Sequence, residues 1–339
     1  MKITASPFTL IFHHTFNISK VARNSTETVY VKIEHEIYTG YGEASLPPYV
    51  KNNQREVVRK LNQFKLPENL TLPDLPKYLQ SLNHEFENIM PAKAALDIAL
   101  HDLFGKMNKL SIRELYNLPK KQTGLTSFTL SIASKETYKS DISKHQQFNF
   151  YKIKLGGSND IKLINDFLSV SDKPFAVDIN QGWNDKSYAL EMTEWLETKG
   201  ALFIEEPMKS LEDTSWLTNQ TNLPIIADEN FQRIYDLDKI SLAYSGVNVK
   251  LSKCGGINEA HTILQRAKEL NIKTMLGCMS ESSCGVSAAA QLAPMCDWLD
   301  LDGPYLINND PFDGYHIIKG QIVLDFPAGI GVLPNNILF

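Results

Sequence analysis

Two lysines alternate with apolar residues in the stretch Phe150–Leu155, and this alternation predicts a β-strand. Lys152 and Lys154 then project from the same side of the strand, because alternate residues share a face. Two ammonium groups held so close disfavour each other's charged form, which lowers the pKa of both. A lysine that can lose its proton near neutral pH is a candidate general base.

Single charged residues end four apolar runs further along the chain. They are Asp178, Glu205, Asp228 and Lys250, and, counting from Lys154, intervals of 22 to 27 residues separate each from the one before. Such an interval accommodates a loop, a helix, a loop and a strand, which is the βα unit of a parallel barrel. All strands of such a barrel end on one face, so we expect these side chains around a single mouth.

Two more apolar runs continue the pattern toward the C-terminus. Residues Lys273–Gly277 and Cys296–Asp300 read as strands, and the second run continues to Asp302. Asp300 and Asp302 share one side of it, where they can bind a cation. The alternative for this pair is a plain turn at Asp302-Gly303-Pro304.

Length and composition bound the class of protein. A chain of 339 residues fits one barrel with a smaller partner domain. The net charge of −5 argues against a nucleic-acid partner, and no apolar run of about 18 residues indicates a membrane span. Residues Met1–Ala5 read as a strand rather than as a signal peptide. The four cysteines show no CxxC spacing, so we expect packed thiols in a cytoplasmic protein.

The chain divides into three parts. We expect an N-terminal α+β capping domain over residues 1–120, a barrel over residues 121–318, and a segment over residues 319–339 that returns to the capping domain. The barrel begins with a strand at Ser127–Ser131. Within the capping domain we expect strands at Phe8–Phe12, Glu27–Glu34 and Gly40–Ala44, a loop over Phe16–Ser25, and helices at Arg55–Phe64, Leu75–Asn88 and Pro91–Gly105.

Over its whole length the chain resembles the enolase superfamily, in its muconate-lactonizing subgroup, and within that subgroup the dipeptide epimerases. The resemblance implies an α/β fold, a modified TIM barrel of the (β/α)7β type with an α+β capping domain. It implies that Lys154 is the base on the second strand, within the Lys152-Ile153-Lys154 motif, and that Lys250 is the base on the sixth. By the same resemblance, Asp178, Glu205 and Asp228 are Mg²⁺ ligands, and Asp300 and Asp302 receive the substrate's α-ammonium group.

Epimerisation removes the proton from a carbon next to a carboxylate and returns it on the opposite face. The intermediate is a dianionic enolate, which a divalent cation stabilises as its charge develops. A set of oxygen ligands without His or Cys favours Mg²⁺ over zinc or copper. The second and sixth strands face each other across a barrel, so Lys154 and Lys250 can exchange the proton from both sides.

Other residues are weaker candidates for substrate binding. We expect Thr129 on the first barrel strand to donate a hydrogen bond, and Glu281 to line the mouth on the side of the seventh strand. The family's capping loop often carries an Arg that meets an acidic substrate side chain, and here that loop offers Lys20 and Arg23. The family often has Gln where Glu206 stands and Ser where Asn230 stands, and neither departure removes a site residue.

We therefore predict a magnesium-dependent isomerase that epimerises dipeptides, such as L-Ala-D/L-Glu from cell-wall peptide, in the cytoplasm. Related enzymes are often oligomeric, so the resemblance is compatible with a homo-oligomer. A cycloisomerase and an N-acylamino-acid racemase are alternatives on the same scaffold, and neither needs Asp300 and Asp302. A barrel that only binds metal and ligand is a third alternative. Taken singly, Asp178, Glu205 and Asp228 can also be helix N-caps, whereas together with the lysines they favour a metal site.

Overall fold

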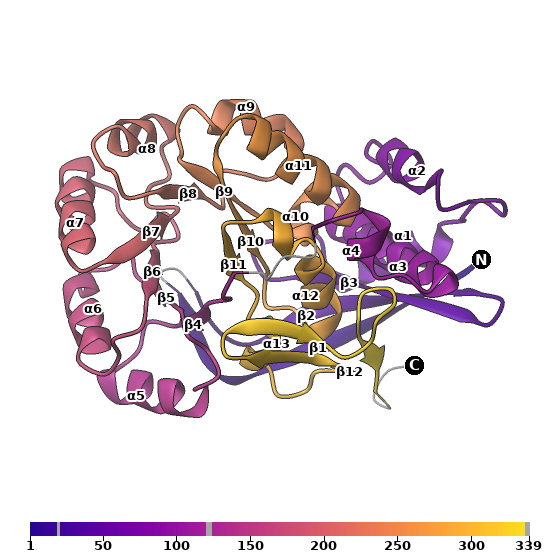
Figure 1. Ribbon diagram of the computed structural model, residues 1–339, viewed down its shortest axis with the longest axis horizontal. Coiled ribbons are helices and arrows are strands. Elements are labelled where there is room, and N and C mark those ends of the chain that lie inside the picture. Colours follow the sequence, from indigo (N-terminus) through magenta and orange to yellow (C-terminus); the bar gives the residue numbers. More distant parts are fainter. Residues whose placement is uncertain (19–20, 120–123, 336–339) are drawn as a thin grey trace.

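The computed structural model describes residues 1–18, 21–119 and 124–335. It consists of a parallel barrel surrounded by helices and an N-terminal sheet-and-helix domain packed beside it (Figure 1). The predicted (β/α)7β barrel with an α+β capping domain is confirmed. Our proposed division at residues 120 and 318 stays a prediction; its first boundary lies outside the described residues, and its second lies between the paired strands β13 and β14.

The capping domain pairs long antiparallel strands with three helices. The elements are β1 (Lys2–Ile18), β2 (Val21–His35), β3 (Tyr38–Leu46), α1 (Gln54–Gln63), α2 (Leu75–Ser81) and α3 (Met90–Asn108), followed by the short α4 (Ile112–Leu115). The strands pair in the order β1-β2-β3, and the apolar side of the sheet packs on α1 and α3. Val57 and Leu61 of α1, four residues apart, are fully buried in this core.

Two expectations for this domain are wrong. The segment 16–25 is not a loop in its described part, because β1 continues to Ile18 and β2 begins at Val21, so that the two strands form one long ribbon. Ala22, Asn24 and Ser25 in this part of β2 are exposed, where polar residues are tolerated. The helix expected over Leu75–Asn88 ends at Ser81, and turns follow it. Asn and His are poor helix formers, and residues 83, 84 and 88 are of these types.

The barrel has eight parallel strands in the described part of the chain. The strands are β4 (Phe128–Leu130), β5 (Tyr151–Lys154), β6 (Phe175–Asp178), β7 (Ala201–Glu205), β8 (Ile225–Ala227), β9 (Gly246–Val249), β10 (Lys273–Gly277) and β11 (Trp298–Asp300). They pair in chain order, and a parallel bridge between Thr126 and Leu299 joins the first strand region to the last. The sheet therefore closes on itself.

Helices cover the outside of this sheet (Figure 1). They are α5 (Lys135–Lys144), α6 (Asp160–Leu168), α7 (Lys186–Thr198), α8 (Leu211–Thr218), α9 (Leu237–Ile240), α10 (Leu251–Cys254), α11 (Ile257–Glu269) and α12 (Ser283–Ala290), with 3₁₀ turns at Ile234–Asp236 and Ala293–Met295. Their buried faces pack on the outward side chains of the strands, such as Ile153, Val177 and Val247. The inward side chains are thereby left to fill the barrel or to line its mouth.

The barrel interior is built in layers two residues apart. A lower layer of Phe150, Ala176, Phe203, Ile226 and Met275 forms one buried apolar cluster. Two residues later on four of these strands stand the predicted charged residues, because alternate strand residues point to the same side. The apolar layer fills the barrel interior and forms the bottom of the site, beneath the charged residues.

The capping domain is attached to the barrel through α3. Lys93 Nζ donates to the Gly255 carbonyl at 3.0 Å, and Asp97 accepts a hydrogen bond from Ile257 N, at the start of α11, at 2.7 Å. Both capping side chains are buried. A carboxylate at a helix N-terminus satisfies backbone donors that have no partner within the helix. These contacts fix the turn that follows Lys250.

The C-terminal part contains α13 (Gly303–Leu306), β12 (Phe312–Asp313), β13 (Tyr315–Ile318), β14 (Gln321–Leu324) and β15 (Leu333–Pro334). β12 pairs with β15, and β13 with β14. Gly329 N donates to the Leu110 carbonyl and Ile330 N to Asp102 of α3, both at 2.9 Å. These bonds support our proposal that residues 319–339 belong with the capping domain.

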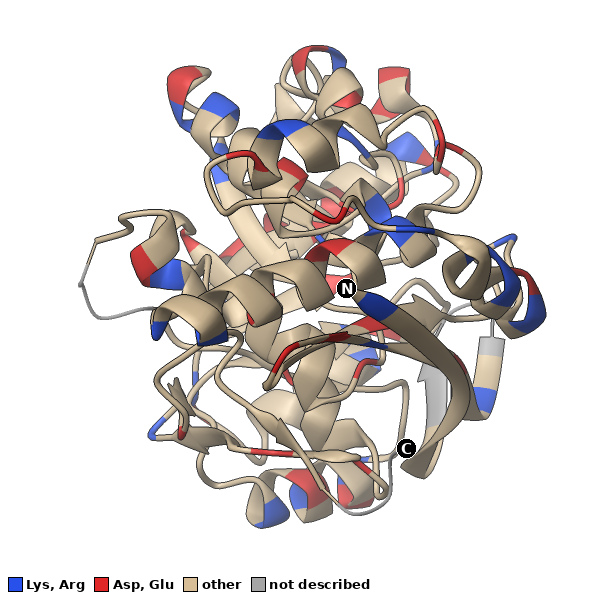
Figure 2. Ribbon diagram, turned by 90° about the vertical axis from the view of Figure 1, so that its right-hand side faces the viewer, with Lys and Arg blue, Asp and Glu red and all other residues tan. Residues whose placement is uncertain are grey.

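Figure 2 views the molecule from the side of the capping domain, where acidic and basic residues are interspersed. None of the helices in the described residues has the length and apolar character needed to cross a bilayer.

The close contact between β3 and α3 yields a prediction on stability. A Cβ on Gly42 would lie 2.0 Å from the Ala95 carbonyl oxygen, which is a backbone atom and cannot move aside. Gly42→Ala should lower the free energy of unfolding by about 1–3 kcal/mol, measured by urea denaturation. Gly157→Ala is the matched control, because a Cβ there meets nothing within 4 Å. Equal stability of the two variants would contradict this packing.

Candidate active site

Four buried lysines and five buried carboxylates meet at the carboxyl ends of the barrel strands. The lysines are Lys152, Lys154, Lys250 and Lys253, and the acids are Asp178, Glu205, Asp228, Asp300 and Asp302. Strand register sets the arrangement, since Lys154 pairs with Asp178 and Asp178 with Glu205 across neighbouring strands. Burial of so many charges requires that they compensate one another.

Lys152 is surrounded by carboxylates. Its ammonium group donates to Asp300 and, at 3.0 Å, to Glu205, and Asp178 lies 3.8 Å away. Burial alone would lower the pKa of Lys152, but these three carboxylates outweigh it and raise the pKa well above its ordinary value. The expected lowering by a neighbouring lysine is therefore wrong for Lys152, because acids from other strands, invisible to local spacing, compensate its charge.

Asp178 and Glu205 lie beneath the other charged groups and are fully buried. Asp178 accepts hydrogen bonds from Lys154 Nζ and from Asn180 N, the latter at 3.0 Å. Glu205 accepts one from Asn248 Nδ2 at 2.7 Å. Burial and the nearby Asp178 carboxylate raise the pKa of Glu205 to about 7.

Asp228 is held between two lysines. Lys250 Nζ donates to Asp228 Oδ2 at 2.8 Å, and Lys253 Nζ to Oδ1 at 2.7 Å. Burial opposes ionisation of Asp228, yet the two ammonium groups hold its pKa below the ordinary value. Lys253 also donates to the carbonyls of Asp228 and Asn248, at 2.8 and 3.1 Å, so all three of its donors are engaged. Lys253 thus positions Asp228.

Asp300 and Asp302 lie at the opposite edge, beside the first barrel strand. Ser127 Oγ donates to Asp300 at 2.6 Å, and the Thr129 backbone N–H donates to Asp302 Oδ2 at the same distance. Burial and the Asp300 carboxylate raise the pKa of Asp302 to about 6. Both acids line the cavity described next, as an acid pair that binds a substrate cation would.

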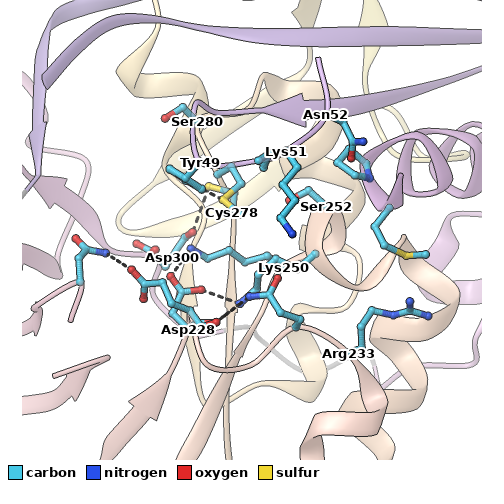
Figure 3. Close-up of a pocket in the computed structure, with 18 of the residues that line it drawn as sticks. Tyr49, Lys51, Asn52, Asp228, Arg233, Lys250, Ser252, Cys278, Ser280 and Asp300 are labelled. Carbon is cyan, nitrogen blue, oxygen red and sulfur yellow. Dashed lines mark hydrogen bonds and ion pairs between the residues drawn. The ribbon is translucent and has the colours of Figure 1, made fainter. Parts of the chain in front are cut away.

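A cavity of about 1250 Å³ opens above these groups, between the barrel and the capping domain. Figure 3 shows Lys250 and Asp228 at its floor, with Tyr49, Lys51 and Ser280 above them. Predicted site residues that line it are Arg23, Thr129, Lys152, Lys154, Asp228, Lys250, Asp300 and Asp302. The structure therefore brings most of the candidates to one place.

Asp178 and Glu205 do not line the cavity themselves but bond to Lys154 and Lys152, which do, whereas Glu281 lies apart from this cluster. Its neighbours Met279 and Ser280 line the cavity, whereas Glu281 turns behind the wall, is 4% exposed and accepts a hydrogen bond from Met279 N at 3.3 Å. Burial raises its pKa to about 7, and burial and the Glu281 carboxylate raise that of Glu43, in the capping domain, to about 8. The expected position at the mouth is wrong, because this carboxyl lies against Glu43 instead.

Arg23 enters the cavity from β2 and is held in place there. It donates to Ser280 Oγ at 2.9 Å and to Thr26 Oγ1 at 3.2 Å, and its guanidinium lies over the Phe12 ring at 5.2 Å. Burial lowers the pKa of Arg23. Lys20, the other candidate of this segment, lies outside the described residues.

The carboxylate set fits a hard divalent cation such as Mg²⁺. Asp178, Glu205 and Asp228 supply only oxygen donors, and their mutual repulsion is what a cation relieves. Two further buried oxygens, Asn180 Oδ1 and Asn248 Oδ1, make no hydrogen bond in the described structure, although each residue's amide nitrogen bonds to one of these acids. They are acceptors suited to an ion or to its water ligands.

The lysines hold the oxygens that such an ion would use. In the described residues no three His, Cys, Asp or Glu side chains converge closely enough to hold an ion, because each carboxylate turns toward an ammonium group. A bound cation and the lysines therefore compete for the same acids.

The sequence reasoning missed three positioning residues, namely Lys253, Asn180 and Asn248. Local spacing carried a signal for two of them. Lys253 follows Lys250 by one helical turn, and Asn180 follows Asp178 by two residues, so each returns to the same acid cluster. Glu206, noted only as a departure, accepts from Asp228 N at 2.6 Å and from Asn230 Nδ2 at 2.6 Å, so it fixes the backbone beneath Asp228.

Comparisons with known proteins agree with this geometry. Residues 138–332 match the family "Enolase C-terminal domain-like", and residues 4–116 match "Mandelate racemase / muconate lactonizing enzyme, N-terminal domain". An L-Ala-D/L-Glu epimerase of Bacteroides thetaiotaomicron is 41% identical, over 98% of this chain and 88% of the relative. An L-Ala-D/L-amino acid epimerase of Maribacter sp. is 33% identical, over 99% of this chain and 100% of the relative.

A solved structure shows the same likeness. A dipeptide epimerase of Enterococcus faecalis, complexed with Mg and the dipeptide L-Leu-L-Tyr, superimposes with a TM-score of 0.87 at 26% identity, over 98% of each chain.

The three bonds of Lys253 predict a large effect of its removal. Lys253→Met leaves Asp228 Oδ1 and two carbonyls without their donor in a buried site, which should destabilise the fold by about 3–5 kcal/mol. Urea denaturation with and without the substitution measures this. Lys268→Met, at an exposed position on α11, is the control and should change little. If Lys253→Met were as stable as the wild type, the hydrogen bonds of Lys253 to Asp228 and Asn248 would not stabilise the fold.

Proposed function

The chain belongs to the mandelate racemase and muconate lactonizing enzyme family of the enolase superfamily, and from that premise we propose that it is a Mg²⁺-dependent dipeptide epimerase. It is an isomerase, as its relatives are. The epimerase names of the relatives and the magnesium and dipeptide in the neighbour support the narrower proposal.

The observation that carries the proposal is the placement of Lys154 and Lys250 around the acid cluster. β5 and β9 are four strands apart in the closed eight-stranded sheet, so the two lysines stand on opposite sides of the mouth. Asp178, Glu205 and Asp228 end the three strands between them. A substrate carboxylate drawn to these acids by a cation places its α-carbon between two amines.

In the proposed reaction, one lysine in its neutral form accepts the α-proton and the other, protonated, donates a proton to the opposite face. Mg²⁺ held by Asp178, Glu205 and Asp228 would supply positive charge to stabilise the negative charge that develops on the substrate carboxylate. Lys152 adds a fixed positive charge beside Glu205 and Asp300, and the apolar layer below keeps bulk water from the reacting carbon. Lys253 and Glu206 hold Asp228 in place throughout.

Asp300 and Asp302 support a dipeptide rather than a simple acid. They lie on β11 and just after it, at the edge away from Asp178 and Glu205, where a free N-terminal ammonium ends up when the C-terminal carboxylate is at the acid cluster. Substrates of cycloisomerases and N-acylamino-acid racemases have no such ammonium. We propose L-Ala-D/L-Glu, or a related dipeptide of cell-wall origin, as the substrate, in agreement with the relative that is 41% identical.

Isotope exchange tests the two-base proposal. In deuterated water with Mg²⁺, the wild type should incorporate deuterium at the α-carbon of the second residue of L-Ala-L-Glu and produce both epimers. Lys154→Met and Lys250→Met should each lower epimerisation at least about 10³-fold, while each variant keeps exchange for the one epimer whose proton faces the remaining lysine. Mass spectrometry and chiral chromatography measure the two quantities. No deuterium in any dipeptide with the wild type would refute the epimerase proposal.

The raised pKa of Asp302 predicts how substrate binding depends on pH. A carboxyl with its pKa raised to about 6 keeps its proton to higher pH than usual, so ammonium binding is complete only at about pH 8 and is lost as pH falls through 6. KM should rise about tenfold per pH unit below that point. Asp302→Asn should raise KM at pH 8 and remove this rise. A KM for the wild type that is constant from pH 5 to 7 would contradict the assignment.

A further inference from the structure

The outer half of the cavity contains a cation that the chemistry above does not use. The lysines that line the cavity in the described residues are Lys51, Lys152, Lys154, Lys250 and Lys253. The four barrel lysines each pair with a carboxylate. Lys51, from the loop between β3 and α1, makes no ion pair or hydrogen bond among the described residues. Its side chain reaches down into the cavity toward Ser252 and Lys250 (Figure 3).

The loop that carries Lys51 is fixed on both sides of it. Val50 N donates to the Pro47 carbonyl at 2.9 Å, and Asn52 Nδ2 donates to the Asn88 carbonyl at 3.0 Å. Asn53 then caps α1, with Glu56 completing the capping box. The backbone at Lys51 is thus held between a turn and a helix cap, so the point from which its side chain extends into the cavity is defined.

The two capping-domain cations lie over different parts of the site. Arg23 is bonded to Ser280, after β10, and therefore lies on the side of Asp300 and the proposed ammonium subsite. Lys51 lies over Lys250 and Ser252, on the side of β9, where the α-carbon of the second residue is placed. In the proposed binding mode, the side chain of that second residue would extend into the outer half of the cavity, which residues of the capping domain line.

We propose that Lys51 determines specificity by pairing with an acidic side chain on the epimerised residue. This inference rests on the proposed dipeptide epimerase function. An ammonium group aimed into a partly enclosed cavity gains a charge-assisted hydrogen bond from a carboxylate and nothing comparable from an amide or a methyl group. The barrel charges are already compensated within the site, so an added substrate anion has Lys51 as its partner on this side.

Glu87 and His84 line the same outer part of the cavity, from the segment after α2. Glu87 carries the opposite charge, and a substrate with a basic side chain is the competing possibility. Both side chains are exposed, and Lys51 is favoured because its side chain reaches toward Ser252 and Lys250. The test therefore includes both kinds of substrate.

Steady-state kinetics with L-Ala-L-Glu, L-Ala-L-Gln and L-Ala-L-Lys provides the test. Glu and Gln have nearly the same shape, so their ratio isolates charge. Lys51→Met should reduce the ratio of kcat/KM for Glu over Gln about 30-fold, mainly through KM, because side-chain binding is the same before and during reaction. Lys51→Glu should shift preference toward L-Ala-L-Lys. Lys65→Met, an exposed capping-domain lysine outside the cavity, should leave the ratio unchanged.

Calorimetric titration of L-Ala-L-Glu and L-Ala-L-Gln, with Mg²⁺ present, separates failure of this inference from failure of the proposed function. If the wild type turns over no dipeptide, the epimerase proposal fails. The proposal for Lys51 can still hold in that case: the wild type would bind L-Ala-L-Glu more tightly than L-Ala-L-Gln, and Lys51→Met would abolish this difference. The proposal is overturned if Lys51→Met leaves the Glu-to-Gln ratio unchanged in both measurements. It is equally overturned if the wild type prefers L-Ala-L-Lys and Glu87→Gln removes that preference.

Discussion

The compensation of buried charge at one end of the barrel is the constraint on which the site depends. Asp178 and Glu205 are fully buried, and Asp228 nearly so, which would be prohibitive for isolated carboxylates. Lysines from β5, from the end of β9 and from α10 supply the opposite charge at hydrogen-bonding distance. Under the proposed function, a divalent cation would take over the carboxylates that these lysines hold. The same amines, once released from the acids, are free to act on a substrate.

Much of this arrangement was predictable, because it follows from strand periodicity. Charged residues at the ends of apolar runs, one βα unit apart, can only converge if the strands are parallel and form one barrel. The segment that contains β5 illustrates this periodicity. Phe150 belongs to the apolar layer inside the barrel, whereas Lys152 and Lys154, on the same side of the chain, belong to the charged groups above it. The placement of Asp300 and Asp302 beside Thr129 follows from closure of the barrel between its first and last strands.

What the sequence did not reveal depends on contacts between distant segments. The charge on Lys152 is compensated by Asp300, 148 residues away, so its pKa is raised where local spacing predicted the reverse. Glu281 accepts a hydrogen bond from Met279 N and lies near Glu43 of the capping domain, a neighbour that local spacing does not show. The polar segment 16–25 reads as a loop because it has no apolar periodicity, although β1 and β2 pair in its described part. The capping loop that contains Lys51 has no helical or strand periodicity, so its position above the barrel could not be predicted from the sequence.

The capping domain completes the site through a few specific contacts. Lys93 and Asp97 of α3 hold the turn after α10, and that helix begins next to Lys250. Tyr49 Oη donates to Met279 Sδ at 3.2 Å, which joins the capping loop to the wall of the cavity. The reactive groups thus come from the rigid barrel, while the roof comes from loops whose sequence can change without disturbing the acid cluster.

A crystal structure with Mn²⁺ in place of Mg²⁺ tests the central claim most directly, since manganese gives an anomalous signal and takes the same oxygen ligands. We expect one anomalous peak bound by Asp178, Glu205 and Asp228, with Lys154 and Lys250 turned away from their acids to face each other across the cavity. A structure at saturating Mn²⁺ that shows no peak there, with both lysines still paired as before, would contradict it.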